Sequence, residues 1–188
     1  MEIIPIHIEK EIEPSDDLSE IISQNTTLDD GDIVVIAQKI ISKQEDRSVN
    51  LSSVSPSLLA EGIASHYHKD SRIVELILSE TKRIVRMKNE IIIVQTNSGF
   101  ICANAGVDES NVKDGYATLL PIDSDISAQN IRQKIKENTN KTVAVIISDT
   151  FGRPFRMGQT NCAIGISGLN PLLDYAGTKD SFGKILRV

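Results

Sequence analysis

Aromatic residues are scarce in this sequence. It has four phenylalanines, three tyrosines and no tryptophan in 188 residues. Surfaces that bind single-stranded nucleic acid usually stack the bases on exposed aromatic rings. The net charge of −6 at neutral pH also opposes general binding to nucleic acid. We therefore expect no nucleic-acid partner.

Cysteines and long apolar runs are also few. Cys102 and Cys162 are the only cysteines, too few for a disulfide framework, and they have no CxxC spacing. No apolar run is long enough to span a bilayer. The amino terminus turns acidic within a few residues, unlike a signal peptide. These features predict a cytoplasmic protein with no membrane partner.

Two common nucleotide-binding motifs are missing. The sequence contains neither GxxxxGK[ST] nor GxGxxG after a strand, which argues against a P-loop or a dinucleotide-binding turn. His66 and His68 resemble a metal-binding pair, but their place near the end of an amphipathic helix favours surface histidines. Cys162 lies in an apolar, glycine-rich segment, where packing is a better explanation than nucleophilic chemistry.

The hydrophobic pattern predicts a mixture of helices and strands, an α+β (mixed α/β) fold over residues 1–188, in a single domain or in one domain with an appendage. An alternating apolar run favours a strand at 2–8, and a continuous one favours a continuously buried strand at 33–37. Further strands are expected at 142–148 and on either side of a turn at 97–99. Segment 41–51 is expected to be a polar connection. Helices are expected to begin at Pro14–Ser15, at Ser55–Pro56, near Ser71 and at Ser127.

Two predicted strands lead into an aspartate. Asp108 follows the strand near residue 102, and Asp149 and Thr150 end the strand at 142–148. Strand ends are common ligand sites in sheets, and carboxylate and hydroxyl oxygens suit a hard divalent cation. Either aspartate alone is more simply explained as a turn or capping residue. Together they predict a metal site.

Basic and amide side chains follow the same strand ends. A site for a triphosphate and a metal needs positive charge on several sides. For Arg47, a solvated charge in an exposed loop is an equally good explanation. The candidates near the first strand end are Gln38, Lys39, Lys43 and Arg47, and those after Asp149 are Arg153 and Arg156.

Four segments of the chain resemble a known family in the same order. They are DGDIVVIAQKIISKQEDR (30–47), NAGVDESN (104–111), LLPIDSDISAQNIR (119–132) and the long block ISDTFGRPFRMGQTNCAIGISGLNPLLDYAGTKD (147–180). On these segments the sequence is similar to coenzyme F-420-0:γ-glutamyl ligases. The resemblance covers essentially the whole chain, and its last block is the most specific.

The resemblance implies an enzyme that uses GTP to join L-glutamate by γ-linkage to the deazaflavin precursor of coenzyme F-420. It implies Mg²⁺ or Mn²⁺, in two ions, together with K⁺ and a homodimer. Carried onto this sequence, Asp108, Asp149 and Thr150 correspond to metal ligands. Gln38, Lys39, Lys43 and Asn111 correspond to GTP-binding residues, and residues 9–12 are weaker candidates because their charged sequence departs from the family pattern.

The implied reaction has no protein nucleophile. The precursor carboxylate takes the γ-phosphoryl group of GTP, and the amine of glutamate then displaces phosphate from the acyl phosphate. The resemblance also implies that the chain stops before a glycine-rich C-terminal part of the family fold. If this short chain were the mature protein, the alternative is a non-catalytic module that binds GTP and metal or the deazaflavin. A dimerising scaffold without a ligand explains the two aspartates less well.

Overall fold

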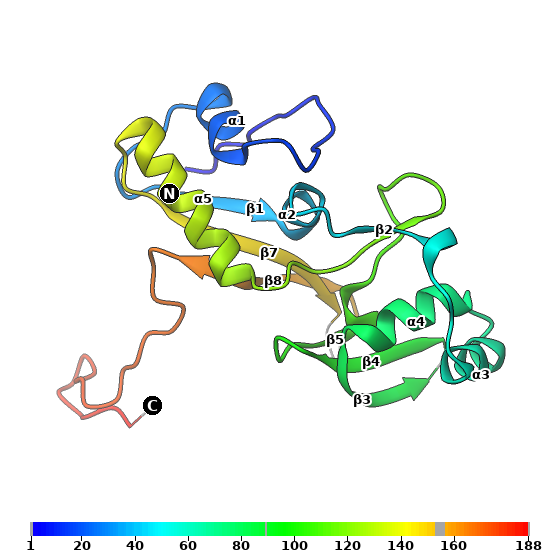
Figure 1. The fold of residues 1–188 in the computed structure, drawn as a ribbon. Coiled ribbons are helices and arrows are strands. Elements are labelled where there is room, and N and C mark those ends of the chain that lie inside the picture. The colour runs from blue at the N-terminus through cyan, green and yellow to red at the C-terminus, as the bar shows by residue number, and fades with distance from the viewer. Residues whose placement is uncertain (1, 89, 153–156, 188) are drawn as a thin grey trace.

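The computed structural model describes residues 2–88, 90–152 and 157–187 (Figure 1). Within them the chain forms five α-helices and two short 3-10 helices, with eight strands in three sheets. The α-helices are α1 (Leu18–Asn25), α2 (Gln38–Gln44), α3 (Leu58–Tyr67), α4 (Ser71–Ser79) and α5 (Ser124–Thr139). The 3-10 helices are η1 (Leu51–Ser53) and η2 (Asn104–Gly106). The predicted mixed α+β class is confirmed.

The sheets combine parallel and antiparallel pairing. In the order β1-β7-β8, β1 is parallel to β7 and β8 is antiparallel to β7. The other sheets, β2-β6 and β3-β4-β5, are antiparallel. The strands are β1 (Ile33–Ala37), β2 (Ser48–Asn50), β3 (Thr81–Lys88), β4 (Ile91–Thr96), β5 (Ile101–Ala103), β6 (Tyr116–Thr118), β7 (Ala144–Gly152) and β8 (Gln159–Ser167).

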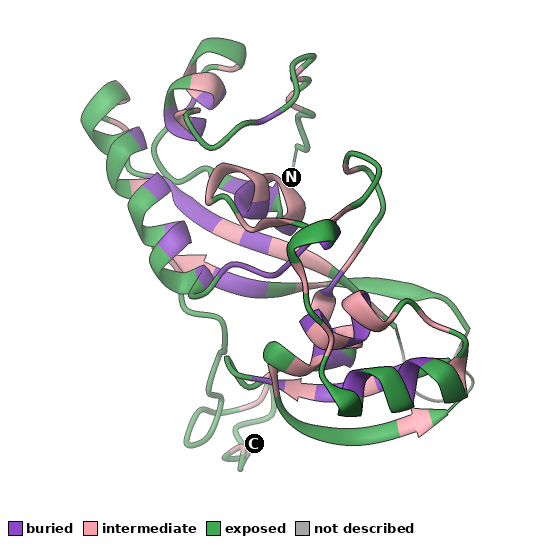
Figure 2. Cartoon of the chain, turned by 45° about the vertical axis from the view of Figure 1, so that its right-hand side comes forward, coloured by how far each residue is buried: buried purple, intermediate pink, exposed green. Residues whose placement is uncertain are grey.

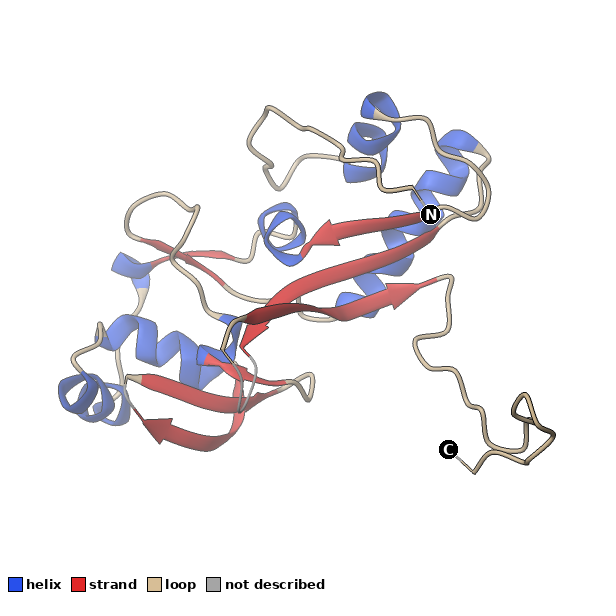
Figure 3. Cartoon of the chain, turned by 180° about the vertical axis from the view of Figure 1, so that it is seen from behind, coloured by secondary structure: helices blue, strands red, loops and turns tan. Residues whose placement is uncertain are grey.

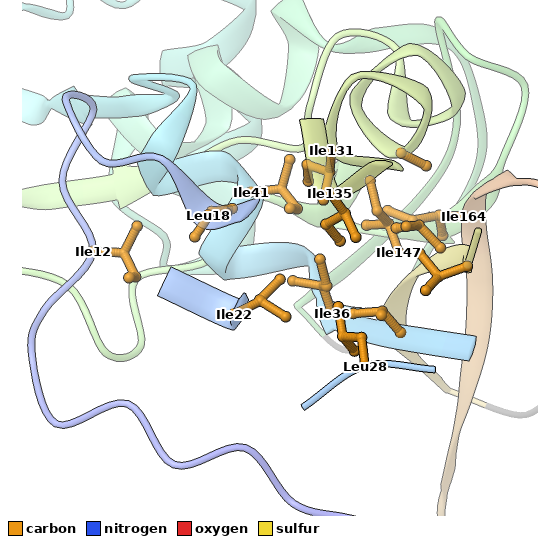
Figure 4. Packing of buried hydrophobic residues seen from close by; sticks show 14 of the residues in the cluster. Ile12, Leu18, Ile22, Leu28, Ile36, Ile41, Ile131, Ile135, Ile147 and Ile164 are labelled. Atoms are coloured by element: carbon orange, nitrogen blue, oxygen red, sulfur yellow. The ribbon is translucent and has the colours of Figure 1, made fainter. Parts of the chain in front are cut away.

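A first hydrophobic cluster lies between the sheet β1-β7-β8 and helices α1, α2 and α5. Ile36 of β1, Ile147 of β7 and Ile135 of α5 meet in it (Figure 4). Burial along β1 alternates, because Val34 and Ile36 face the helices while the residues between them face outward. The prediction of a continuously buried strand at 33–37 was therefore right about the strand and wrong about its burial.

A second cluster lies between the sheet β3-β4-β5 and helices α3 and α4 (Figures 1 and 3). Ile92 and Val94 of β4 are fully buried beneath Val74 and Ile77 of α4. The small sheet β2-β6 packs into the second cluster, to which it contributes the buried Ala117 and the partly buried Val49. The expectation of a single domain lacking a C-terminal part stays a prediction.

Several predicted element boundaries were wrong. Residues 2–8 form no strand; Ile6 and Ile8 instead pack irregularly against the first cluster. The first helix begins at Leu18 because Asp17 caps it, and the helix expected at Ser127 begins at Ser124, capped by Asp123. Both aspartates accept hydrogen bonds from two backbone amides of the first turn, which fixes the helix start.

Five elements were missed: α2, β2, β3, β6 and β8. The expected polar connection at 41–51 contains most of α2 and all of β2, and β3, β6 and β8 were not anticipated. The last predicted strand also runs further, so that Asp149 and Thr150 lie inside β7 rather than after it. A β-bulge interrupts the β7–β8 ladder just before Asp149, between the pairs of Ile147 and Ser148.

No helix in the described residues has the length and apolar character needed to cross a membrane. After β8, the chain leaves the sheet and extends away from both clusters (Figure 3).

Candidate functional site

The carboxylate of Asp108 is held by three hydrogen bonds. Its backbone pairs with Thr118 in an isolated β-bridge, which fixes the residue after η2. The Nζ atom of Lys39 donates to Oδ2 at 2.5 Å, and Ser110 donates to Oδ2 from Oγ at 2.7 Å. The backbone amide of Ser110 donates to Oδ1 at 2.9 Å, and the backbone amide of Thr118 donates to the main-chain oxygen of Asp108 at 2.8 Å.

Lys39 connects this loop with α2. The helix begins directly after β1, so its second residue stands at the end of that strand. Besides Asp108, Lys39 Nζ donates to the backbone oxygen of Ser110 at 2.5 Å and to its Oγ at 2.7 Å. Burial opposes ionisation of Asp108, but Lys39 and Ser110 outweigh it and hold the pKa of Asp108 below its ordinary value.

The charges of Asp108 and Lys39 both act on the pKa of Asp149. Burial raises the pKa of Asp149, and the negative charge of Asp108 raises it further, against the opposing effect of Lys39. This influence indicates that the two carboxylates are near enough for their charges to interact. Within residues 2–88, 90–152 and 157–187, no ion pair involves Asp149. A cation would therefore add to the partial compensation that Lys39 and the Thr150 backbone amide give Asp149.

Thr150 and Asn161 face each other across β7 and β8. Their backbones are paired in the ladder, and Thr150 Oγ1 donates to Asn161 Oδ1 at 2.9 Å. The described residues hold no cluster of three or more His, Cys, Asp or Glu side chains suited to a metal ion. The donors available from Asp108, Asp149 and Thr150 are all oxygen atoms. This set fits Mg²⁺ or Mn²⁺, which also bind phosphate oxygens and water, better than a soft metal.

A cavity of about 270 Å³ lies beside this group. Lys43 Nζ donates to the backbone oxygen of Asn111 at 2.8 Å and forms an ion pair with Glu11. The cavity therefore has walls from α2, from the loop after Asp108 and from the amino-terminal segment. Its lining residues are Ile8, Lys10, Glu11, Ile12, Lys39, Ile40, Lys43 and Asn111.

The structure thus brings most predicted site residues together. Lys39, Lys43 and Asn111 line one cavity, and Lys39 also joins it to Asp108. A second cavity of about 170 Å³ shares Glu11, Ile12 and Lys43 with the first, so the two lie side by side along the amino-terminal segment. A bound anion here would meet the ammonium groups of Lys39 and Lys43.

Two predicted residues have protein partners instead. The buried amide of Gln38 donates to Ser42 Oγ at 2.5 Å and to the Leu119 carbonyl at 3.4 Å. Arg47 Nε donates to the Leu120 carbonyl and its Nη2 donates to Glu80 Oε1, both at 2.9 Å. Their predicted ligand contacts stay predictions.

Arg153 and Arg156 lie outside the described residues. Ser110 and Asn161 were not predicted, although each contacts a predicted metal ligand. Ser110 had a local signal, because a serine two residues after an aspartate commonly donates its amide to that carboxylate in a turn. Asn161 had none, because its contact depends on strand pairing across a hairpin.

Comparison with known proteins gives a consistent result. The family model described as "F420-0:Gamma-glutamyl ligase" matches residues 7–188. The chain is 42% identical over 188 residues to a protein of Methanopyrus kandleri named "Coenzyme F420:L-glutamate ligase", covering all of this chain and 75% of the relative.

Two further relatives carry the same name. The chain is 48% identical over 157 residues to the protein of Methanothermobacter thermautotrophicus, covering 84% of this chain and 62% of the relative. It is 39% identical over 188 residues to the protein of Archaeoglobus fulgidus, covering all of this chain and 75% of the relative. The chain therefore spans between about three-fifths and three-quarters of the length of these relatives.

Proposed function

The chain belongs to the F420-0:gamma-glutamyl ligase family, a family of ligases, and we propose that it joins L-glutamate by γ-linkage to the precursor of coenzyme F420 with GTP as the phosphoryl donor. The observation that carries this proposal is the convergence of Asp108, Asp149 and Lys39 in one electrostatic group beside the Lys43 cavity. The elements that supply these residues lie far apart in the sequence.

The first step forms an acyl phosphate. A carboxylate oxygen of the acceptor attacks the γ-phosphorus of GTP, the bond from that phosphorus to the β,γ-bridging oxygen breaks, and GDP leaves. Lys39 and Lys43 offset the charge of the phosphates, so that the negative acceptor can approach them. No protein nucleophile is needed, because the acceptor supplies the attacking oxygen.

The second step forms the amide. The glutamate amine attacks the acyl carbon, the carbon–oxygen bond to the phosphoryl group breaks, and inorganic phosphate leaves while the amine gives up a proton. Asp108, Asp149 and Thr150 would hold the divalent cations, which supply charge neutralisation and orientation of the phosphates. Ser110 and Asn161 hold Asp108 and Thr150 in position for this role. Two ions, a K⁺ requirement, a homodimer and a cytoplasmic location stay predictions from the resemblance.

The test is product formation by the purified chain. Incubation with GTP, Mn²⁺ or Mg²⁺, L-glutamate and the F420 precursor is expected to give a product heavier by one glutamyl residue, together with GDP and phosphate. Asp149→Asn is expected to abolish the product while the circular dichroism spectrum is retained. Binding of GTP and Mn²⁺ without any product would instead support the non-catalytic binding module.

A further inference from the structure

The strand β3 carries an unusual concentration of positive charge. Its eight residues, TKRIVRMK, include four basic side chains, although the chain as a whole has a net charge of −6. All four are exposed, and Figure 2 shows the strand exposed over most of its length. Within the part of the chain that the structure describes, no acidic side chain forms an ion pair with any of them. They are Lys82, Arg83, Arg86 and Lys88.

Three of these side chains share the open face of the sheet β3-β4-β5. On β4, Ile92 and Val94 are buried against the helices, so the residues between them face the other way. The register pairs Arg83 with Gln95, Arg86 with Ile93 and Lys88 with Ile91. Side chains of directly paired residues lie on the same face, and Arg83 Nε indeed donates to Gln95 Oε1 at 2.6 Å.

The opposite edge of this sheet borders the carboxylate group. β5 contacts β7, with the rings of Phe100 and Phe151 centred 6.2 Å apart in an edge-to-face arrangement. Burial and, after it, the charge of Asp149 raise the pKa of Cys102 on β5 to about 11. Adjacent strands lie about 4.8 Å apart, so β3 is roughly 10 Å from β5 across the sheet. Cys102 pairs with the buried Val94 and so lies on the covered face of the sheet, which means that a tail extending from Asp149 would have to pass around the β5 edge to reach the basic face on the other side.

Each round of the proposed reaction makes the acceptor more negative. Each γ-ligation converts one acceptor carboxylate into an amide and adds a glutamate that brings two carboxylates. The tail of the acceptor therefore gains one negative charge in every round. In a second round, the newest carboxylate must reach the γ-phosphate while the older one lies further back along the tail.

We propose that the open face of β3, with Arg83, Arg86 and Lys88, binds the carboxylates of the acceptor's γ-glutamyl tail. This inference rests on the proposed function. The complementarity is electrostatic: exposed guanidinium and ammonium groups without described acidic partners face a ligand whose negative charge grows with use. The face accordingly favours an acceptor that already carries glutamate over one that carries none.

The decisive variant is Arg86→Gln/Lys88→Gln, which removes two exposed charges without emptying a core position. With the acceptor that carries one γ-glutamate, KM for the acceptor is expected to rise roughly threefold to tenfold. KM for GTP and kcat are expected to change little. With the acceptor that carries none, the rise is expected to be smaller. The difference from the unaltered chain should shrink at high salt, because exposed charge pairs are screened.

A matched control removes two charges elsewhere. Lys134→Gln/Lys141→Gln alters the exposed Lys134 in the second half of α5 and the half-buried Lys141 just after the helix, which pair with Asp17 and Asp29. This variant is expected to leave KM for both acceptors unchanged. An equal rise in KM with the control pair would assign the effect to net charge rather than to β3, and would overturn the proposal.

Direct binding separates this proposal from the proposed function. Tri-γ-glutamate, titrated into the ¹⁵N-labelled chain at low salt without GTP, is expected to shift the amide resonances of residues 82–88. The same titration of Arg86→Gln/Lys88→Gln should give much smaller shifts. If the chain makes no product at all, this titration still decides the question. The proposal is overturned if the β3 resonances do not shift, or if the double variant keeps its KM but aggregates more readily. Either result would mean that the charges only protect an edge strand.

Discussion

The ammonium group of Lys39 lies 2.5 Å from the carboxylate of Asp108, although 69 residues separate them in the sequence. This ion pair joins the end of β1 to the loop that follows β5. It also places a positive charge beside Asp149, whose pKa it lowers against the larger effect of burial. Lys39 thus pairs with Asp108, acts electrostatically on Asp149 within β7, and lines the same cavity as Lys43.

Lys39→Gln is expected to weaken GTP binding by tenfold or more, because a phosphate-facing ammonium group is lost while a polar side chain of similar length remains. Isothermal titration with GTP and Mn²⁺ measures the effect. Lys134→Gln, at an exposed lysine of α5 that lines neither cavity, serves as the control with the same change in charge. Equal affinities for Lys39→Gln and the unaltered chain would remove Lys39 from the nucleotide site.

Ser110→Ala is expected to raise the Mn²⁺ concentration needed for half-maximal activity several-fold. The Oγ atom donates to Asp108 and accepts from Lys39, so its loss frees the carboxylate to rotate while the backbone amide bond remains. The expected cost in the free energy of unfolding is only about 1 kcal/mol. Ser110→Thr, which keeps the hydroxyl, should restore metal dependence. Failure of threonine to do so would argue that Ser110 acts only through packing.

Asp149→Asn is expected to make the metal-free protein more stable at pH 7 while it abolishes ligation. The pKa of Asp149 in the folded chain lies above its ordinary value of 3.8, so the folded state binds the proton more tightly than the unfolded state. Stability therefore falls as pH rises from about 3.8 through the folded-state pKa. Asparagine has no such charge to bury. Urea unfolding of both proteins at pH 7 and pH 3.5 should show a gap at neutral pH that closes in acid.

Addition of Mn²⁺ gives the matching control for Asp149. The ion should stabilise the unaltered chain, because it binds the folded state and neutralises the carboxylates. It should stabilise Asp149→Asn much less. An equal gain in melting temperature for both proteins would place the cation elsewhere.

Arg47→Gln is expected to lower the free energy of unfolding by about 1–3 kcal/mol and to leave the Kd for GTP unchanged. Its guanidinium group satisfies the Leu120 carbonyl and pairs with Glu80, which links the two halves of the fold. Urea unfolding and GTP titration of the same sample provide both measurements. A loss of GTP affinity without a loss of stability would instead support the predicted phosphate contact.

Gly165→Ala is expected to destabilise the chain by about 1–3 kcal/mol. A Cβ atom at Gly165 would lie 2.3 Å from the backbone oxygen of Ser124, so α5 would have to move away from β8. Gly62→Ala is the control: its Cβ would meet nothing within 4 Å, and it lies inside α3. Alanine there should stabilise the helix by about 0.5–1 kcal/mol. Thermal unfolding compares the two.

The sequence pattern was most informative where one helix face is strongly apolar. Val74 and Ile77 of α4, and Ile131 and Ile135 of α5, are buried as expected from their spacing. Their periodicity reflects packing against one sheet, which a local window can detect.

The missed elements have few such signals. α2 has only seven residues and no side-chain cap, while β3 is an edge strand whose charged, exposed residues give no buried alternation. The candidate site was predictable in its aspartates and lysines, since each follows an apolar run. The roles of Gln38, Arg47 and Asn161 depend on which distant carbonyl or side chain lies opposite, and no local pattern contains that information.

The bulge before Asp149 limits how this hairpin can change. Ile147 pairs with Gly165 and Ser148 with Ala163, so Ile164 is the extra residue that lets Asn161 lie opposite Thr150. With uninterrupted pairing from Ile147 onward, Cys162 would occupy that position, and a thiol would replace the amide oxygen beside the threonine. Insertion or deletion of a single residue at the bulge would therefore give Asp149 and Thr150 different partners on β8, whereas a substitution that keeps the register would not.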